Sequence, residues 1–308
     1  MNAKRGFTLI ELVVVLAILA LVTHLAVREM AHLRDSRLSQ LADRQLGELR
    51  DAVWCDQPGQ EPTGFVVDTG RLPRGSEMTN GAHAVSVSLR ELWERPVNMR
   101  PYALRPATAA NLMGPATNDL ADAEVYIGCG WRGPYIRLPS GAERLMDAWG
   151  NRMENLDDAG YDRLLADNGT AVATGGPVWR IRHLGADGRL DSESEPSNAA
   201  QRDTEMRLLP EGGLTNRLSV ATTFVDGSGP KAVSGNVQIR WYAPCGDMIT
   251  GSVAQVEMNG TALATSTFSC VPPGAATLVV VVGGQKRAQE RVIVPPGGRD
   301  VSMKVFVP

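Results

Sequence analysis

The pattern of hydrophobic positions is most distinctive at the start of this 308-residue chain. Phe7 opens an apolar run that continues to Val22, and only Thr8 and the carboxylate Glu11 interrupt it. A membrane-spanning helix needs about 20 apolar residues, and the segment reaches that length only by extending to Val27 and including further polar residues. A carboxylate within such a helix costs roughly 2.5 kcal/mol or more, so Glu11 is expected to mark a function.

Beyond Val27 the pattern changes from uniformly apolar to amphipathic. Apolar residues recur at steps of three and four as far as Val53, with Arg, Asp, Glu and Gln between them. No proline interrupts this segment. The pattern predicts one helix from Phe7 to about Trp54, roughly 70 Å long at 1.5 Å per residue. We interpret this helix as a stem, residues 7–54, that carries a globular head.

The C-terminal part of the chain consists of short runs rich in β-branched residues, and clusters of Gly, Pro, Asn and Asp separate them. The runs cover residues 218–225, 237–242, 253–258, 263–268, 277–282, 288–294 and 301–307. Strands at this spacing predict a β-sandwich over residues 214–308, and Pro210–Gly213 reads as a linker between it and a head over residues 55–210. The final stretch, where Pro273-Gly274 precedes a strand, resembles immunoglobulin-like or carboxypeptidase-regulatory-like modules.

The residues around the start of the apolar run resemble a known processing signal. Lys4 and Arg5 precede Gly6, and Glu11 is the fifth residue of a segment that begins at Phe7. This arrangement resembles the class III signal of type IV prepilins and pseudopilins. The resemblance implies cleavage between Gly6 and Phe7 by a prepilin peptidase and N-methylation of Phe7. An ordinary secretory signal would show an A-x-A-like cleavage site behind its apolar core, and none is present.

The same resemblance gives Glu11 a role and implies partners. Residues 1–6 would be a leader, and the mature chain would sit in the bacterial inner membrane as a single-pass protein with its head in the periplasm. A carboxylate in a water-free bundle of stems must be neutralised by a proton or a cation. The resemblance implies that the new amino terminus of Phe7 on a neighbouring subunit supplies that cation. The implied partners are the prepilin peptidase, other pilin-like subunits and an inner-membrane assembly platform.

Part of the predicted head resembles the major pseudopilin of type II secretion. In that family a D-P-W-G-N turn precedes a small antiparallel sheet, and a glycine- and aspartate-containing loop follows it. The chain departs from the family by an alanine in place of the proline of the turn and by an insertion over residues 75–125. The residues that carry the resemblance are Gly133–Ile136, Leu138-Pro139, Asp147–Asn151, Trp179–Arg182 and Leu184–Gly188.

An acidic loop over residues 185–203 is the one candidate for a metal site. Major pseudopilins of type II secretion bind calcium in the matching loop, and hard oxygen ligands suit that ion. The resemblance makes Asp187, Asp191 and Asp203 the leading ligands. A merely solvated acidic loop is the alternative, and no cofactor other than calcium is expected.

Four cysteines, an even number, are compatible with disulfides in an oxidising periplasm. They allow three pairings in principle, and free buried thiols are the alternative. We expect Cys55–Cys129 and Cys245–Cys270, because each bridge would then stay within one proposed domain.

Composition and motifs argue against other classes of function. The net charge is −3 with basic and acidic residues interspersed, so no nucleic-acid surface is expected. The segment Gly128–Gly133 fits the dinucleotide pattern G-x-G-x-x-G, but Pro134 and a strand-like stretch follow where the mechanism needs a helix. The four histidines are not clustered as zinc ligands, and no G-x-S-x-G elbow is present. We therefore expect a protein that is not an enzyme.

The sequence predicts an α+β fold with a long helical stem, a pilin-like head containing a small antiparallel sheet, and a C-terminal β-sandwich. The first functional hypothesis is a structural subunit of a periplasmic pseudopilus in a type II secretion-like machine. The alternative is a minor type IV pilin whose sandwich binds a surface or a partner protein. The added domain and the insertion are bulky for a subunit at high copy, which favours the alternative to some degree.

Overall fold

A computed structural model describes residues 9–56, 60–74, 76–80, 83–113, 121–138, 145–151, 153–156, 180–186, 188, 203–209 and 216–307. The predicted cleavage site at Gly6 and Phe7, and the predicted ligands Asp187 and Asp191, lie outside these residues. The chain divides into two compact units. The first comprises residues 1–45, 146–152 and 183–204, and the second comprises residues 46–145, 153–182 and 205–308.

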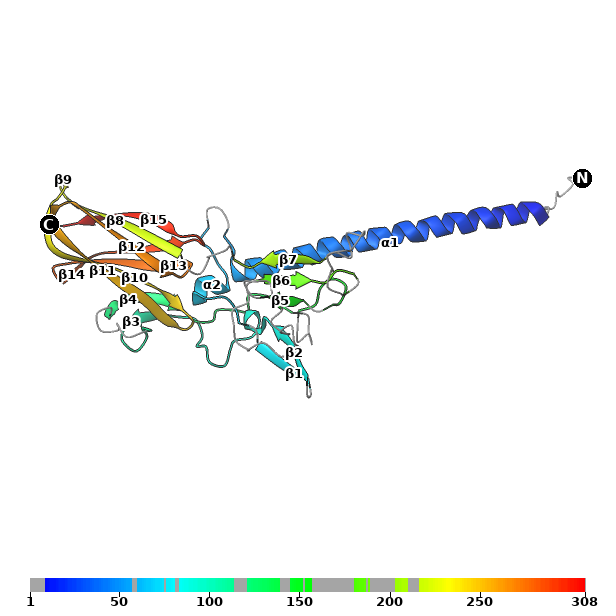
Figure 1. The fold of residues 1–308 in the computed structure, drawn as a ribbon, viewed down its shortest axis with the longest axis horizontal. Coiled ribbons are helices and arrows are strands. Elements are labelled where there is room, and N and C mark those ends of the chain that lie inside the picture. Colours follow the sequence, from blue (N-terminus) through cyan, green and yellow to red (C-terminus); the bar gives the residue numbers. More distant parts are fainter. Residues whose placement is uncertain are drawn as a thin grey trace, which may run out of the picture. The chain divides into compact units, whose positions relative to one another are not determined.

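The predicted stem is a single helix, α1, which runs from Leu9 to Val53 (Figure 1). Its end agrees with the predicted one, and the amide of Trp54 still donates to the carbonyl of Arg50 at 2.8 Å. The absence of proline explains its continuity, because each interior residue can keep its hydrogen bond to the residue four positions earlier. The last turns of α1 are amphipathic, and Leu46, Leu49 and Val53 are buried there.

The head is built from short elements. A small helix, α2, covers Phe65–Thr69, and a 3-10 turn, η1, covers Arg90–Leu92. Three small sheets are formed by the pair β1 (Ser76–Asn80) and β2 (His83–Ser88), the pair β3 (Ala103–Ala107) and β4 (Asp122–Cys129), and the triplet β5 (Glu154–Leu156), β6 (Arg180–His183) and β7 (Thr204–Arg207).

A hydrophobic cluster joins the end of α1 to the head within the second unit. The buried residues from α1 pack with those of α2, of η1, and of β6 and the segment after β7. Its largest fully buried members are Leu46, Phe65, Leu72, Leu89, Leu92, Ile181, Leu208 and Leu209. The head therefore has an apolar core that includes the amphipathic end of the stem.

The predicted β-sandwich is confirmed, and each predicted run falls on one of its strands. The longer sheet has the order β11-β10-β13-β14 and the other has the order β12-β8-β15, with the short β9 (Gly229–Pro230) beside β8. All neighbours are antiparallel except β15, which pairs with β8 in parallel. The other strands are β8 (Asn216–Asp226), β10 (Val233–Cys245), β11 (Met248–Thr261), β12 (Leu263–Val271), β13 (Gly274–Val282), β14 (Gln285–Val294) and β15 (Arg299–Phe306).

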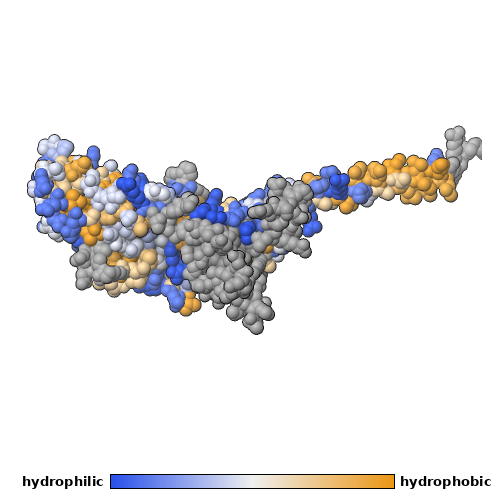
Figure 2. All heavy atoms as spheres, viewed as in Figure 1, coloured by the Kyte–Doolittle hydropathy of each residue, from blue (hydrophilic) through white to orange (hydrophobic). Residues whose placement is uncertain are grey.

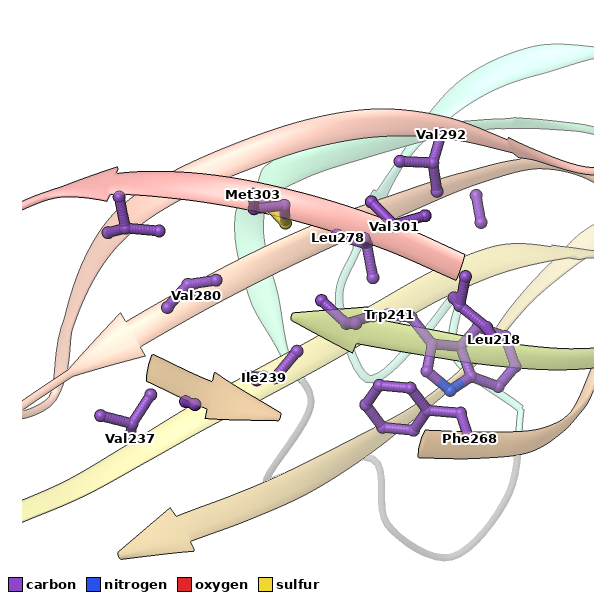
Figure 3. Packing of buried hydrophobic residues seen from close by; sticks show 14 of the residues in the cluster. Leu218, Val237, Ile239, Trp241, Phe268, Leu278, Val280, Val292, Val301 and Met303 are labelled. Carbon is purple, nitrogen blue, oxygen red and sulfur yellow. The ribbon is translucent and has the colours of Figure 1, made fainter. Parts of the chain in front are cut away.

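Alternating side chains of the two sheets form the sandwich core, as strand geometry requires. Figure 3 shows Val237, Ile239 and Trp241 of β10 among residues of the opposite sheet. The ring of Trp241 meets that of Phe268 edge to face, with centroids 6.4 Å apart. This aromatic pair crosses from one sheet to the other, so it ties the two layers together.

Strand β13 is buried on both faces, which explains why its sequence is continuously apolar rather than alternating. Leu278 and Val280 belong to the sandwich core, whereas Val279 and Val281 belong to a second cluster on the outer face of the same sheet. The β3–β4 hairpin provides that second layer through Val125, Ile127 and Cys129, among others.

Polar contacts fix the hairpin and its flanking loops to the sandwich. The amides of Met113 and Ile249 donate to the carbonyls of Ile249 and Asn111 respectively, each at 2.8 Å. Arg100 forms an ion pair with Asp247 at 2.7 Å. The β3–β4 hairpin of the head and the sandwich thus share a core within one compact unit. The predicted linker at residues 210–213 gave no indication of this shared core.

Close approach of backbones completes this junction at the end of α2. Gly70 adopts a φ of 65°, and a Cβ built there would lie 1.9 Å from the carbonyl oxygen of Pro244. Only glycine fits the position, both for its conformation and for its space. The neighbouring Thr69 carbonyl accepts a hydrogen bond from the amide of Gly246 at 2.6 Å.

Replacing Ile127 by Ala should lower the free energy of unfolding by about 2–4 kcal/mol, because it opens a cavity in the cluster shared by the hairpin and the sandwich. Denaturant titration of the detergent-solubilised chain measures the change. Tyr126→Ala is the matched control, since this neighbour on β4 points to the other face and is 55% exposed. Equal effects of the two substitutions would show that the hairpin does not unfold together with the sandwich.

Candidate functional site

The first half of α1 is an exposed apolar surface. Every Leu, Ile, Val and Met from Leu9 to Leu33 is exposed, with fractions between 44% and 82%. Figure 2 shows this part of the helix as a nearly continuous hydrophobic surface that gives way to hydrophilic residues further along. Soluble proteins rarely leave apolar patches of this extent in water, so such a surface is expected to contact lipid or other protein.

The length and composition of this surface suit a bilayer. Among the described residues, α1 is the one helix that is long and apolar enough to cross a membrane. The segment from Leu9 to Val27 spans about 28 Å at 1.5 Å per residue, and the hydrocarbon core of a membrane is about 30 Å thick. Arg28 and Glu29 follow directly, so charge begins where the apolar length ends.

Polar residues within the apolar half are placed in ways that limit their cost. The hydroxyl of Thr23 donates to the carbonyl of Leu19 at 2.7 Å, so its proton is bonded within the helix. Glu11 lies in the first described turn of α1, where the helix dipole favours negative charge. Glu11 is thus the one carboxylate on the apolar part of α1, and it lies near the end of the described helix where a negative charge costs least.

Two of the motifs in the predicted head contact each other within the first unit. Asp147 accepts hydrogen bonds from the amides of Trp149 and Asn151, at 3.0 and 2.7 Å, through the same carboxylate oxygen. This arrangement closes a tight turn. The side-chain amide of Asn151 then donates to the carbonyl of Gly185 at 2.8 Å, which links the turn to the start of the acidic loop.

His183 packs beside this turn and is almost completely buried. Its ring lies 5.6 Å from that of Trp149, and its Nδ1 accepts a hydrogen bond from the amide of Gly185 at 3.3 Å. Its Nε2 is 3.7 Å from a carboxylate oxygen of Asp43 on α1. Nδ1 is the acceptor in this contact, whereas Nε2 is buried without a hydrogen-bond partner among the described residues.

The described structure includes one of the three predicted calcium ligands and does not test whether they come together. Asp203 is described, whereas Asp187 and Asp191 lie outside the described residues, and those that are described contain no group of three acidic, His or Cys side chains that could hold a metal. The second carboxylate oxygen of Asp147 is buried without a hydrogen-bond partner in the described part of the chain. It is a hard oxygen donor close to the acidic loop, so the chemistry fits calcium while the site stays a prediction.

The structure contains neither predicted disulfide, because all four cysteines are free thiols. The expectation kept each bridge inside one domain, but Cys129 contacts the sandwich, where its thiol donates to the carbonyl of Asp247 at 3.6 Å. Cys245 and Cys270 lie on β10 and β12, which belong to different sheets. Burial raises the pKa of the Cys129 and Cys245 thiols, so both are poor nucleophiles.

Sequence reasoning missed a buried polar cluster centred on Asp68. Its carboxylate accepts a hydrogen bond from the hydroxyl of Tyr135 at 3.0 Å and pairs with Arg132 at 3.1 Å. The sequence does contain an indication of this cluster, because Asp68 follows three apolar residues in α2, and all of α2 is buried. A carboxylate in such a run must be paired or neutralised when it is buried, as Glu11 must be in a bundle of stems.

Residues 1–27 match the prokaryotic N-terminal methylation motif. The motif and the long apolar helix behind it support a type IV pilin-like protein, a structural rather than an enzymatic class, anchored in the inner membrane. The motif implies processing by a prepilin peptidase and assembly with other pilin-like subunits. No curated protein matches the chain. The match ends with the apolar segment of α1 and does not reach the head or the sandwich.

Replacing Asp68 by Asn should change how stability depends on pH. Burial raises the pKa of the Asp68 carboxyl above its ordinary value of 3.8, despite the opposing effects of Arg132 and Tyr135. A raised folded-state pKa gives stability that is present below the unfolded pKa and is lost as pH rises through the folded pKa. The unfolding free energy of the wild type should therefore fall with rising pH, from 3.8 upward, relative to Asp68→Asn. Parallel profiles from denaturant titrations would contradict this account.

Proposed function

We propose that this protein is a structural subunit of a periplasmic pseudopilus in a type II secretion-like machine. It is inserted in the inner membrane, cleaved between Gly6 and Phe7, and polymerised through its stem. The exposed apolar half of α1 carries the proposal, because it suits lipid before assembly and neighbouring stems afterwards. The head and sandwich are carried by the amphipathic end of the same helix.

The position of Glu11 supports assembly by stem packing. An apolar surface alone would let two helices slide past each other, since no contact distinguishes one register from the next. A carboxylate at one depth, paired with the amino terminus of Phe7 on a neighbour, would favour a single axial offset. The pairing also removes the cost of an ionised group in a water-free bundle.

Replacing Glu11 by Val should leave membrane insertion and cleavage intact, because the stem becomes more apolar. Filament yield should fall by about tenfold or more, since a charge pair in a water-free setting is lost. Electron microscopy of sheared filaments measures yield, and mass spectrometry checks that wild type and variant both begin with N-methyl-Phe7.

Glu29→Val is the matched control, because Glu29 lies on the same helix beyond the apolar segment and should assemble normally. Normal filaments from the Glu11 variant would reject a register role for this carboxylate. An intact Met1 terminus in a host that has prepilin peptidase would reject the processing step itself.

A minor type IV pilin is the second candidate, and the layered head favours it. The sandwich and the β3–β4 hairpin form a large body that contributes nothing to the polymerising stem. Such a body suits a subunit present at low copy that binds a surface or a partner protein. Quantitative mass spectrometry of purified filaments separates the two, since one copy per filament supports the minor pilin and many copies support the pseudopilus subunit.

We also propose that the loop over residues 185–203 binds calcium, with Asp187, Asp191 and Asp203 as ligands. Calcium at millimolar concentration should then raise the melting temperature of the solubilised chain by mass action, and chelation should reverse the shift. Asp187→Ala should abolish the response, and Asp300→Ala, at an acidic position of the sandwich, should retain it. The absence of any shift in the wild type would exclude the site.

A further inference from the structure

A cavity of about 220 Å³ lies within the second unit, where three parts of the chain meet. One wall is the segment from Glu61 to Asp68, which ends in α2. A second wall is the β3–β4 hairpin with the residues beside it, and the third is the outer face of β13 and β14. The cavity therefore lies beside the junction between the head and the sandwich, and no residue of α1 lines it.

The charged groups that line this cavity neutralise one another. They are two carboxylates and two guanidinium groups, from Glu61, Asp68, Arg132 and Arg291. Arg132 pairs with Asp68 at 3.1 Å, and Arg291 pairs with Glu61 at 3.1 Å. A charged ligand would have to displace one of these pairs, whereas a neutral polar ligand can bond to the same groups and leave both pairs in place.

An aromatic ring and its neighbours hold the binding groups in place. The guanidinium carbon of Arg132 lies 3.9 Å from the centroid of the Tyr102 ring, a cation–π contact. The hydroxyl of Tyr102 lies against Gly128, where a Cβ would come within 2.0 Å of it. Position 128 thus requires glycine. Arg132 uses one nitrogen of its guanidinium group, Nη2, for Asp68, so its other N–H groups can donate to a ligand.

Hydroxyl groups supply the remaining polar lining. They belong to Thr63, Tyr102, Tyr126 and Thr277, and none of the four makes a side-chain hydrogen bond within the described part of the chain. Each hydroxyl can both donate and accept. Tyr126 also offers a ring that is more than half exposed at the rim.

We propose that this cavity binds one unit of a neutral saccharide. Saccharides present hydroxyl groups that donate and accept, together with apolar C–H faces that pack on aromatic rings, and the lining provides partners for both. The volume is below the range of about 300–1,000 Å³ typical of sites for drug-sized ligands, which suits a single ring rather than a long segment. The proposal is independent of filament assembly, because no stem residue takes part.

Binding can be measured on the full-length protein in a zwitterionic detergent whose head group carries no sugar, since a maltoside would compete. The neutral probes are cellobiose, maltose and N,N′-diacetylchitobiose, and the comparison probes are glucuronate and tetra-alanine. Saturation-transfer NMR should detect saturable binding of at least one neutral disaccharide at concentrations up to about 10 mM.

Tyr126→Ala should weaken that binding by about threefold to tenfold, through loss of an aromatic contact. Thr63→Val, which removes one hydroxyl at an exposed position, should weaken it as well. Phe306→Ala is the matched control, because this exposed ring lies on β15 of the other sheet and does not line the cavity.

The proposal is overturned if no neutral disaccharide binds in this concentration range, or if glucuronate or tetra-alanine binds more tightly than all three. It is also overturned if binding occurs but Tyr126→Ala and Thr63→Val leave it unchanged. Loss of saccharide binding in a variant that still forms filaments would separate this site from assembly.

Discussion

The rest of the structure depends on the apolar surface of α1, because exposing this surface to water is energetically unfavourable. Every large aliphatic side chain from Leu9 to Leu33 is exposed, so the isolated subunit is incomplete without lipid or neighbouring helices. The same helix becomes amphipathic near its end, where Leu46, Leu49 and Val53 complete the core of the head. One continuous helix therefore has an exposed apolar part, which lipid or neighbouring helices must cover, and an end from Ala42 onward that the chain itself buries.

A second organising feature is the layering around β13. This strand supplies Leu278 and Val280 to the sandwich core and Val279 and Val281 to the cluster beneath the β3–β4 hairpin. The sheet that contains β13 is thus the middle of three layers, between the β12-β8-β15 sheet and the β3–β4 hairpin, so the sandwich is joined to the head by packing as well as by a linker. The ion pair between Arg100 and Asp247 and the approach of Gly70 to Pro244 add polar and steric contacts along the same boundary.

The regular elements were predictable from sequence, because their periodicity is local. The helix is apolar or amphipathic throughout, and each of the seven runs after residue 214 falls on one strand. What sequence reasoning could not supply were contacts between distant segments. The apolar run of β13 predicts a buried strand but not which segments cover it. No pattern in residues 75–125 indicates that some of these residues pack on its outer face. The surroundings of Cys129 were also hidden from sequence reasoning, since its thiol lies against a sandwich turn and all four cysteines are free in the structure.

The double burial of β13 has a consequence for how the chain reaches its native state. A strand with both faces in a core must be apolar along its whole length, and the stretch from Leu278 to Val282 has no charge, proline or glycine to interrupt it. Segments of this kind are prone to intermolecular β-aggregation while they are exposed. The β3–β4 hairpin precedes β13 in the chain, so the residues that cover the outer face of β13 have already been synthesised when this strand is made. The order of the elements along the sequence thus makes a cover for β13 available without waiting for later residues.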